Sequence, residues 1–267
     1  MSDSLKKRAG RMVPYPLIEA GRKLLHFGLR QCPVCRSRIR RLLDAGYGFP
    51  ILEKLQVVGG MRRPADVCPV CHSSARERLV WYWLTHENAK FRHGRSARVA
   101  HFAPEKGLSR NLKDFAGDGY KAYDFDPSRY RHLRKIEQAD LTSLTIEPSS
   151  VDLLICNHVM EHVPSPKRAL DNIFQSLAPG GTAIMQVPIA LALDESIELS
   201  ADSTAQERID RLGQDDHLRL YSQNDYEAVL TNAGFEVELF NAFDHDEHKA
   251  TAWQLDPLER LFVCRKA

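Results

Sequence analysis

No stretch of this 267-residue chain approaches the roughly 20 consecutive apolar residues that a membrane-spanning helix needs. The N-terminal segment MSDSLKKRAGRMVPYPL is basic, but the apolar core of a secretory signal does not follow it. Low-complexity tracts are also missing, and a content of 43% hydrophobic and 27% charged residues is typical of a globular domain. These absences predict a cytoplasmic protein without a membrane span.

Glycine is scarce at the point where a nucleotide-binding α/β domain usually has a Gly-rich turn. In RVAHFAPEKGLSRNL, residues 98–112, an apolar run leads through a proline into a helix-like segment, and Gly107 is the only glycine. The stretch is either a cofactor loop without the usual fingerprint or an ordinary strand-to-helix turn. The order of the segments that follow it favours the cofactor loop.

Cysteine is infrequent, and four of the six cysteines form two CPVC repeats separated by 32 residues. Two such tight turns place four thiolates at the corners of a tetrahedron, the arrangement that Zn²⁺ prefers. Four sulfurs leave no open position for a catalytic water, so the predicted zinc site is structural; a disulfide pair and a redox CxxC are the alternatives. The predicted ligands are Cys32, Cys35, Cys68 and Cys71, whereas Cys156 and Cys264 lie in apolar runs and are expected to be buried in strands.

Charge is unevenly divided along the chain. Residues 1–98 hold 20 Lys/Arg against 7 Asp/Glu, whereas the remaining 169 residues hold 17 against 28. This asymmetry predicts two parts with different roles. The basic part could meet nucleic acid, an anionic surface or the acidic part of its own chain.

The second part alternates strand-like and helix-like segments. Apolar runs such as RVAHFA, VDLLICN and TAIMQVP are separated by amphipathic stretches such as PKRALDNIFQSLA. This alternation predicts an α/β fold with a doubly wound, mostly parallel sheet. Between the CPVC repeats, short apolar runs broken by Gly and Pro predict small strands and turns, and the segment HSSARERLVWYWLTHENAK predicts a Ser-capped helix.

Over roughly residues 97–266 the chain resembles a class I S-adenosylmethionine-dependent methyltransferase of the type 11-like group. The resemblance is carried by ADLTSL, then VDLLICNHVMEHV, then LAPGG before another strand, and by the late pair NAGFEVELF and LFVCRK. It implies a Rossmann-like, seven-stranded sheet and the cofactor S-adenosyl-L-methionine. The expected parts are a basic helix at 1–30, the zinc module with its connecting helix at 31–96, and the methyltransferase domain at 97–267 with an insertion at about 189–216.

The resemblance also implies a cofactor site at the carboxyl ends of the strands, where doubly wound sheets bind ligands. This cofactor has no pyrophosphate, so a loop with one glycine is compatible with it. Gly107 would allow a close backbone approach, and Glu105 would meet the ammonium group of the ligand. The full expected set is Ala103, Pro104, Glu105 and Gly107 along the methionine portion, Asp124 on the ribose, Asp140 and Leu141 on the adenine, and Asn157 on cofactor or substrate.

Candidate catalytic groups follow the fourth strand and end the insertion. Methyl transfer needs an in-line sulfonium, a nucleophile held close and often a base. His217 paired with Asp216 is the favoured base, and His158 is the alternative. Arg219 and Tyr221 are the expected substrate contacts, with a salt bridge as the alternative role of Arg219.

These features favour O-methylation of a hydroxyl on a small molecule or glycan. The Asp/Asn-Pro-Pro-aromatic motif of enzymes that methylate base amines is missing from the sequence. One alternative is an RNA methyltransferase that uses the basic zinc module to grip phosphates. The other is a binding protein that keeps the fold and has lost the chemistry.

Overall fold

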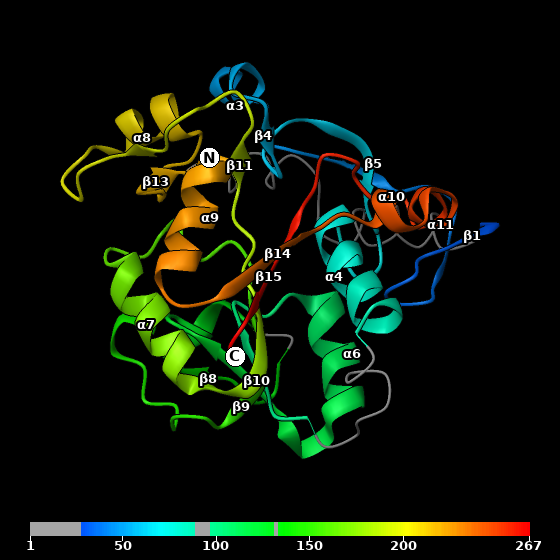
Figure 1. The fold of residues 1–267 in the computed structure, drawn as a ribbon. Helices are drawn as coiled ribbons and strands as arrows, with labels where there is room; N and C mark the ends of the chain where they lie inside the picture. Colours follow the sequence, from blue (N-terminus) through cyan, green and yellow to red (C-terminus); the bar gives the residue numbers. More distant parts are fainter. Residues whose placement is uncertain (1–27, 89–96, 131–132) are drawn as a thin grey trace.

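The computed structural model describes residues 28–88, 97–130 and 133–267. It contains a small N-terminal module followed by a seven-stranded sheet flanked by helices (Figure 1). The basic helix expected over residues 1–30 lies almost entirely outside the described residues. No helix in the described part of the chain is long and apolar enough to cross a membrane.

The central sheet has the strand order β14-β15-β10-β9-β6-β7-β8. Strand β15 is antiparallel to both of its neighbours, and the other pairings are parallel. The predicted doubly wound α/β class is therefore confirmed, including the reversed C-terminal hairpin. The strands are β6 (Val99–Phe102), β7 (Tyr120–Asp124), β8 (Glu137–Gln138), β9 (Val151–Cys156), β10 (Leu177–Ile184), β14 (Glu236–Phe240) and β15 (Leu261–Arg265).

Two apolar cores lie on opposite faces of this sheet. Helices α7 (Pro166–Ser176) and α9 (Gln223–Asn232) pack on one face, and α4 (Ala75–His86) and α6 (Lys106–Ala116) pack on the other (Figure 1). Within β9 the buried side chains alternate between the faces, as the two-residue period of a strand requires: Leu154 enters the first core and Ile155 the second. Near-continuous apolar runs are therefore needed in the central strands, because both faces are covered.

The remaining elements of the sheet domain are short. They connect the strands or extend the second core near the C-terminus. They are η1 (Gly117–Gly119), η2 (Pro127–Arg129), η3 (Leu141–Ser143), α10 (Ala242–His245) and α11 (Glu247–Ala252).

The N-terminal module consists of short antiparallel pairs, as its Gly and Pro punctuation predicts. Strand β1 pairs with β2, and β3 pairs with β5. A short helix that the sequence did not predict, α3, begins at a proline that is compatible with the first helical turn. The module elements are β1 (Arg30–Gln31), β2 (Arg38–Ile39), β3 (Leu43–Ala45), α3 (Pro50–Lys54), β4 (Val57–Val58) and β5 (Arg63–Val67).

Helix α4 joins the module to the sheet domain. Ser74 caps it in a capping box with Glu77, as the Ser-containing segment after the second CPVC repeat predicts. Its apolar residues, including Leu79 and Trp83, are buried in the second core against the sheet. The module is thus anchored by a helix whose apolar side chains belong to the core of the sheet domain.

Arg78 of α4 and Arg63 of the module bind the C-terminal segment before β15. Arg78, which is 1% exposed, donates to the Asp66 carboxylate at 3.0 Å and to the Gln254 carbonyl at 2.7 Å. Arg63 forms an ion pair with Asp256. Part of the basic charge of residues 1–98 is therefore neutralised within the chain, one of the three roles that the charge asymmetry allowed.

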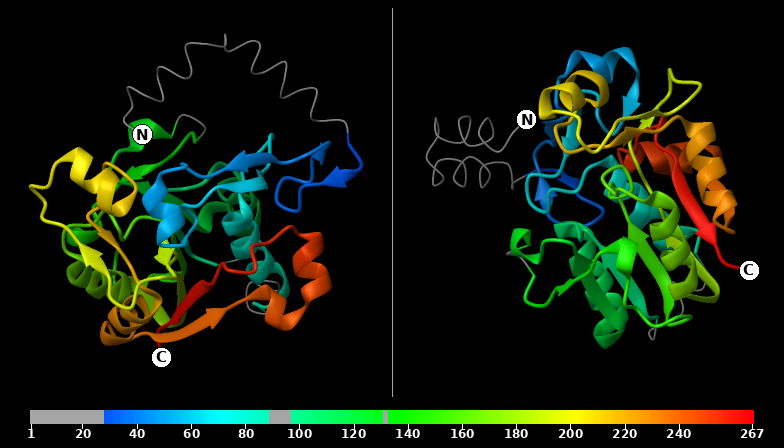
Figure 2. Two further views of the ribbon diagram at one scale, coloured as in Figure 1. Left: turned by 90° about the horizontal axis from the view of Figure 1, so that it is seen from above. Right: turned by 90° about the vertical axis from the view of Figure 1, so that its left-hand side faces the viewer.

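The expected insertion, at about 189–216, contains β11 (Ile189–Ala190), β12 (Ile197–Glu198) and α8 (Ala205–Leu212), and β13 (Arg219–Leu220) follows it. Its strand β11 pairs with β4 of the N-terminal module. Both views of Figure 2 and the view of Figure 1 place α3 next to α8 at one end of the molecule, and the two helices are in contact. Insertion and module therefore meet over the same edge of the sheet.

Candidate functional site

The carboxyl ends of β6 and β9, which are adjacent in the sheet, carry strained backbone. Ala103 directly follows β6 with φ 47°, and His158 follows β9 with φ 54°. Both values lie in the left-handed region that non-glycine residues rarely occupy. Such strain persists where the surrounding structure over-determines it, and it is common in ligand-binding sites.

Glu105, at the start of α6, is held by two buried partners. One carboxylate oxygen lies 2.6 Å from His101 Nε2, and the other accepts from Asn157 Nδ2 at 2.9 Å. Burial opposes ionisation, but the hydrogen bond and charge of His101, together with Arg76, lower the pKa of Glu105 below its ordinary value. Glu105, the residue expected to contact the ammonium group of the cofactor, is therefore ionised. Its carboxylate also accepts a hydrogen bond from Asn157 at the end of β9.

Gly107 has a different neighbour from the expected one. A Cβ at this position would lie 3.1 Å from Val34 Cγ1 and 3.5 Å from Cys71 Sγ, both in the N-terminal module. The missing side chain allows α6 to pack against the cysteine cluster. On the side where a Cβ would lie, the close approach to Gly107 is made by the module.

The acidic residues that follow β7 and β8 lie at strand ends, as expected. Asp124 ends β7, where its carboxylate accepts from Tyr130 Oη at 2.8 Å and from the Asp126 amide at 2.8 Å. Asp140 caps η3 by accepting from the amide and hydroxyl of Thr142, each at 2.8 Å. Leu141 is buried beside it.

Several buried polar atoms at the ends of β9 and β10 have no hydrogen-bond partner in the described chain. Buried polar groups are nearly always paired in folded proteins, so a concentration of unpaired atoms indicates a site for a polar ligand. His158 also donates its backbone amide to the Gln186 carbonyl at 2.7 Å, which brings the two strand ends together. The unpaired atoms are Asn157 Oδ1, His158 Nε2, both carboxylate oxygens of Glu161, Gln186 Oε1, His217 Nδ1 and Tyr221 Oη.

His217 is buried, but it lies beside different groups from the expected one. Its Nε2 lies 4.0 Å from Glu161 Oε1, and its ring meets His162 edge to face at 4.7 Å. Asp216 instead contacts His162, through its backbone carbonyl at 3.0 Å and its carboxylate at 3.7 Å. The structure therefore pairs Asp216 with His162 rather than with His217, because the bend before β13 directs these adjacent side chains to different neighbours.

Arg219 is 3% exposed, and both terminal nitrogens of its guanidinium group bind the protein. It donates to the carbonyls of Met160 at 2.9 Å and Val163 at 2.5 Å, and to Glu198 Oε1 at 2.8 Å. Arg219 therefore has the alternative role expected for it, a salt bridge. Its hydrogen bonds to the two carbonyls hold the turn after β9 in place. The ring of Tyr221 packs at a tilt on Tyr226, and burial raises the pKa of its hydroxyl.

A cavity of about 630 Å³ lies between the N-terminal module, the start of α4 and the segment before β15. Gly59 of the module lines it, and a Cβ on Gly59 would lie 3.1 Å from His158 Cε1, so His158, just after β9, packs against the cavity wall. Arg76 and Glu259 also line it, and burial raises the pKa of Glu259 to about 7. Glu259 accepts from Gln186 Nε2 at 3.1 Å.

The sequence reasoning missed His101, Arg76, Gln186 and Glu259. None of them belongs to a local motif, and they approach the site from separate elements. The one available signal was chemical: a histidine inside the otherwise apolar run RVAHFA is an unusual residue for a buried strand.

The four predicted zinc ligands lie together, with all four sulfur atoms within 4.8 Å of one another. The separations Cys32–Cys71 and Cys35–Cys68 are both 3.8 Å between Sγ atoms. With Zn–S bonds of about 2.3 Å, the edge of a tetrahedron is about 3.8 Å, so these sulfurs fit a zinc ion.

The two CPVC turns have the same backbone geometry. Arg36 N donates to Cys32 O at 2.8 Å, and His72 N donates to Cys68 O at 3.0 Å. Arg36 and His72 have φ values of 59° and 66°, so each turn ends in the left-handed region. This repeat explains why two equal spacings in the sequence produce two equivalent pairs of sulfurs.

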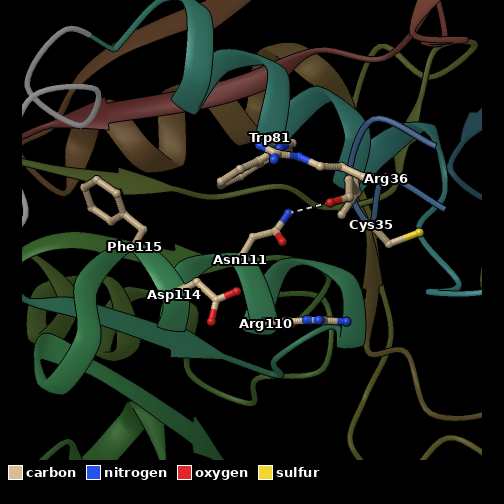
Figure 3. Close-up of a pocket in the computed structure, with 8 residues that line it drawn as sticks. Cys35, Arg36, Trp81, Arg110, Asn111, Asp114 and Phe115 are labelled. Atoms are coloured by element: carbon tan, nitrogen blue, oxygen red, sulfur yellow. Dashed lines mark hydrogen bonds between the residues drawn. The ribbon is translucent and has the colours of Figure 1, made fainter. Parts of the chain in front are cut away.

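A second cavity of about 400 Å³ lies between the first CPVC turn, α4 and α6 (Figure 3). Trp81 and Phe115 line it together with Arg36 and Arg110. Asn111 Nδ2 donates to the Val34 carbonyl at 2.8 Å, so α6 and the module form one wall.

Comparison with known proteins shows similarity to methyltransferases. A family model described as a methyltransferase domain matches residues 19–239. An S-adenosylmethionine-dependent methyltransferase from Mesorhizobium loti is similar over 72% of this chain and 100% of its own, with a TM-score of 0.51 and 15% identity. At that identity the similarity concerns the fold.

Two further solved structures are similar at lower TM-scores. One from Archaeoglobus fulgidus, also described as an S-adenosylmethionine-dependent methyltransferase, covers 73% of this chain and 96% of its own, at a TM-score of 0.46 and 11% identity. The CurJ carbon methyltransferase covers 72% and 54%, at a TM-score of 0.45 and 16% identity. No curated protein matches the chain.

Proposed function

The chain belongs to the methyltransferase domain family, and from that premise we propose that it transfers the methyl group of S-adenosylmethionine to a hydroxyl of a small molecule or glycan. The cluster of unpaired buried polar atoms after β9 and β10 carries this proposal. The cluster lies at the carboxyl edge of the sheet, where doubly wound folds bind ligands.

The residues present fit S-adenosylmethionine. Ala103, Pro104 and Glu105 lie where the methionine portion would run, and the ionised Glu105 suits its ammonium group. Asp124 would accept from the ribose hydroxyls, and Asp140 with Leu141 would contact the adenine. When bound, the cofactor supplies an electrophilic methyl group on a sulfonium.

The cavity between the module and the strand ends is the proposed acceptor site. Arg76 and Glu259 line it, so the acceptor would be polar. The ring of His158 lies against Gly59 of the cavity lining, its Nε2 has no hydrogen-bond partner in the described chain, and we assign it the role of base. His158 would accept the hydroxyl proton while the acceptor oxygen attacks the methyl carbon and the C–S electron pair stays on sulfur. This choice makes the alternative base the favoured one, because His158 lies against a residue of the cavity lining, whereas the contacts of His217 are with Glu161 and His162.

Titration calorimetry of the full chain with S-adenosylmethionine and S-adenosylhomocysteine tests the proposal, followed by turnover assays with polyhydroxylated acceptors. We expect micromolar binding of both ligands. Absence of binding would contradict the cofactor site; binding without turnover of any acceptor would favour the binding-protein alternative.

The four cysteines, we propose further, bind a structural Zn²⁺. All four ligand positions would be filled by sulfur, so no position is open for catalysis. The module has a small core that includes three of these cysteines. A bound ion would supply the stability that so small a core lacks.

RNA is the second candidate acceptor, and the cavity in Figure 3 is the observation that favours it. Trp81 and Phe115 offer surfaces on which bases stack, and Arg36 and Arg110 offer cations for phosphates. Fluorescence anisotropy with a short single-stranded RNA would show affinity that falls steeply with salt. Arg110→Glu should weaken it more than Lys113→Glu on the same helix; equal effects would exclude the groove.

A further inference from the structure

Glu161, His162 and His217 form a second cluster of ligand atoms, separate from the four cysteines. Their ligand atoms lie within 4.8 Å of one another. His162 Nε2 and His217 Nε2 lie 3.9 Å and 4.0 Å from Glu161 Oε1. Ligands at about 2.1 Å from one ion lie about 3.0–3.4 Å apart, so small side-chain rotations would bring all three onto a metal.

We infer that these three residues bind a divalent transition-metal ion. Two imidazoles and one carboxylate suit Mn²⁺, Fe²⁺, Co²⁺ or Zn²⁺, whereas Mg²⁺ and Ca²⁺ prefer shells of oxygen. The cluster joins the turn after β9 to the end of the insertion, which the sequence separates by more than 50 residues.

The carboxylate of Glu161 is the strongest evidence for a cation. Glu161 is 1% exposed, and neither of its oxygens has a hydrogen-bond partner in the described chain. A buried carboxylate without partners is costly, and an ion bound between it and the imidazoles would remove that cost. Three histidines face the Glu161 carboxylate. The nearest is His158, whose Nδ1 lies 3.6 Å from Glu161 Oε1, and none of the three is within hydrogen-bond distance.

The surroundings of the histidines are those of a metal site. The ring nitrogen Nδ1 of His162 lies 3.0 Å from the Asp216 carbonyl, so it carries the proton and leaves the lone pair of Nε2 facing Glu161. Such an outer hydrogen bond commonly fixes the tautomer of a metal-binding histidine. His162 is about one-third exposed at its side chain, which provides a route for the ion.

The backbone holds the two ligand-bearing segments together without the ion. The amide of Leu218 donates to the Glu161 carbonyl at 2.9 Å, directly beside His217. Arg219 clamps the same turn through the carbonyls of Met160 and Val163. Arg219 is therefore a positioning residue for the cluster.

A role for this ion in catalysis rests on the proposed function. His158 connects the two regions, because its Nδ1 faces Glu161 and its ring lies against Gly59 at the cavity. An ion at the cluster would lie on the Nδ1 side of the His158 ring, opposite the Nε2 to which the base role is assigned, so it would act on the acceptor only through that ring. Metal binding itself is independent of cofactor and acceptor.

Metal analysis of the full chain, stripped and then reloaded with Co²⁺, tests the inference. We expect two ions per chain: one with the thiolate charge-transfer bands of the cysteine site, and one with only the ligand-field bands of a nitrogen and oxygen site. Glu161→Gln and His162→Ala should each remove the second ion, or weaken its binding by at least about 10–100-fold. His248→Ala, an exposed histidine on α11, is the matched control and should retain both.

One ion per chain, unchanged in Glu161→Gln and His162→Ala, would overturn the inference. His162 is partly exposed, so His162→Ala is expected to fold even if the buried Glu161→Gln does not. Calorimetry with S-adenosylhomocysteine on the same samples separates the two claims: failure of cofactor binding contradicts the proposed function, and loss of the second ion alone does not.

Discussion

Gly107 lies against Cys71: a Cβ on Gly107 would be 3.5 Å from the sulfur of Cys71. Gly107 is in the first turn of α6, directly after the loop that ends β6. The cysteine cluster therefore supports the back of the same helix whose N-terminal end faces the proposed cofactor site. The N-terminal module and the loop between β6 and α6 therefore form one packed unit.

Replacing Gly107 with valine tests this packing. A branched side chain would displace Val34, which is already 3.1 Å from the position of a Cβ, so we expect a loss of about 1–3 kcal/mol in the free energy of unfolding. Urea denaturation gives this value. Lys113→Val on the exposed side of the same helix is the control; equal effects of the two would show that helix propensity, and not the module contact, is responsible.

Removal of one zinc ligand should destabilise the module. We expect Cys68→Ser to lower the thermal midpoint by at least about 5 °C, because the small core around the cysteines loses its ion. A chelator should lower the midpoint of the wild-type chain and leave that of the variant unchanged. Freshly purified protein without zinc would contradict the prediction.

Asp124→Ala should weaken binding of S-adenosylmethionine. Loss of charge-assisted hydrogen bonds to the ribose would cost about 1–3 kcal/mol of binding free energy, measurable by calorimetry. Asp118→Ala, at the opposite end of β7, is the control and should bind normally. An unchanged dissociation constant for Asp124→Ala would exclude this residue from the site.

His158→Gln separates catalysis from cofactor binding. We expect turnover to fall by about 10²–10⁴-fold, the usual contribution of a general base, while the affinity for S-adenosylhomocysteine stays near the wild-type value. Full activity would transfer the base role to another group. His217→Ala, compared under the same conditions, identifies whether that group is His217.

Glu259 makes stability depend on pH. Its pKa is raised to about 7, chiefly by burial, so the folded chain keeps the proton over a range in which an unfolded glutamate, at about 4.3, has lost it. The folded state then binds more protons than the unfolded state, and stability falls as the pH rises from about 4.3 to 7.

Glu259→Gln should remove that slope. Urea denaturation at pH 5 and pH 8 should show the variant gaining stability over the wild-type chain at the higher pH, because a neutral amide has no charge to bury. Glu247→Gln, exposed on α11, should follow the wild-type curve. If the free energies of unfolding of Glu259→Gln and the wild type changed in parallel with pH, the raised pKa of Glu259 would be disproved.

Local patterns in the sequence were sufficient for the fold and for the cysteine cluster. The alternation of apolar runs and amphipathic stretches identified the strands of the sheet except the short edge strand β8, because both faces of the sheet's centre are buried. Two equal CPVC spacings predicted two equivalent turns, because a tight turn directs its own sulfurs. Asp124 could be placed at a strand end because the apolar run before it predicts the strand β7.

The tertiary structure alone decided which groups meet. Gly107 packs on the module and not on an open loop, and Asp216 meets His162 while His217 meets Glu161. Arg76 and Glu259 face one cavity from opposite ends of the chain. The periodicity of a helix or strand fixes the direction of a side chain within its own element. Contacts between residues 36 to 183 positions apart depend on how the elements pack, and no local spacing encodes that.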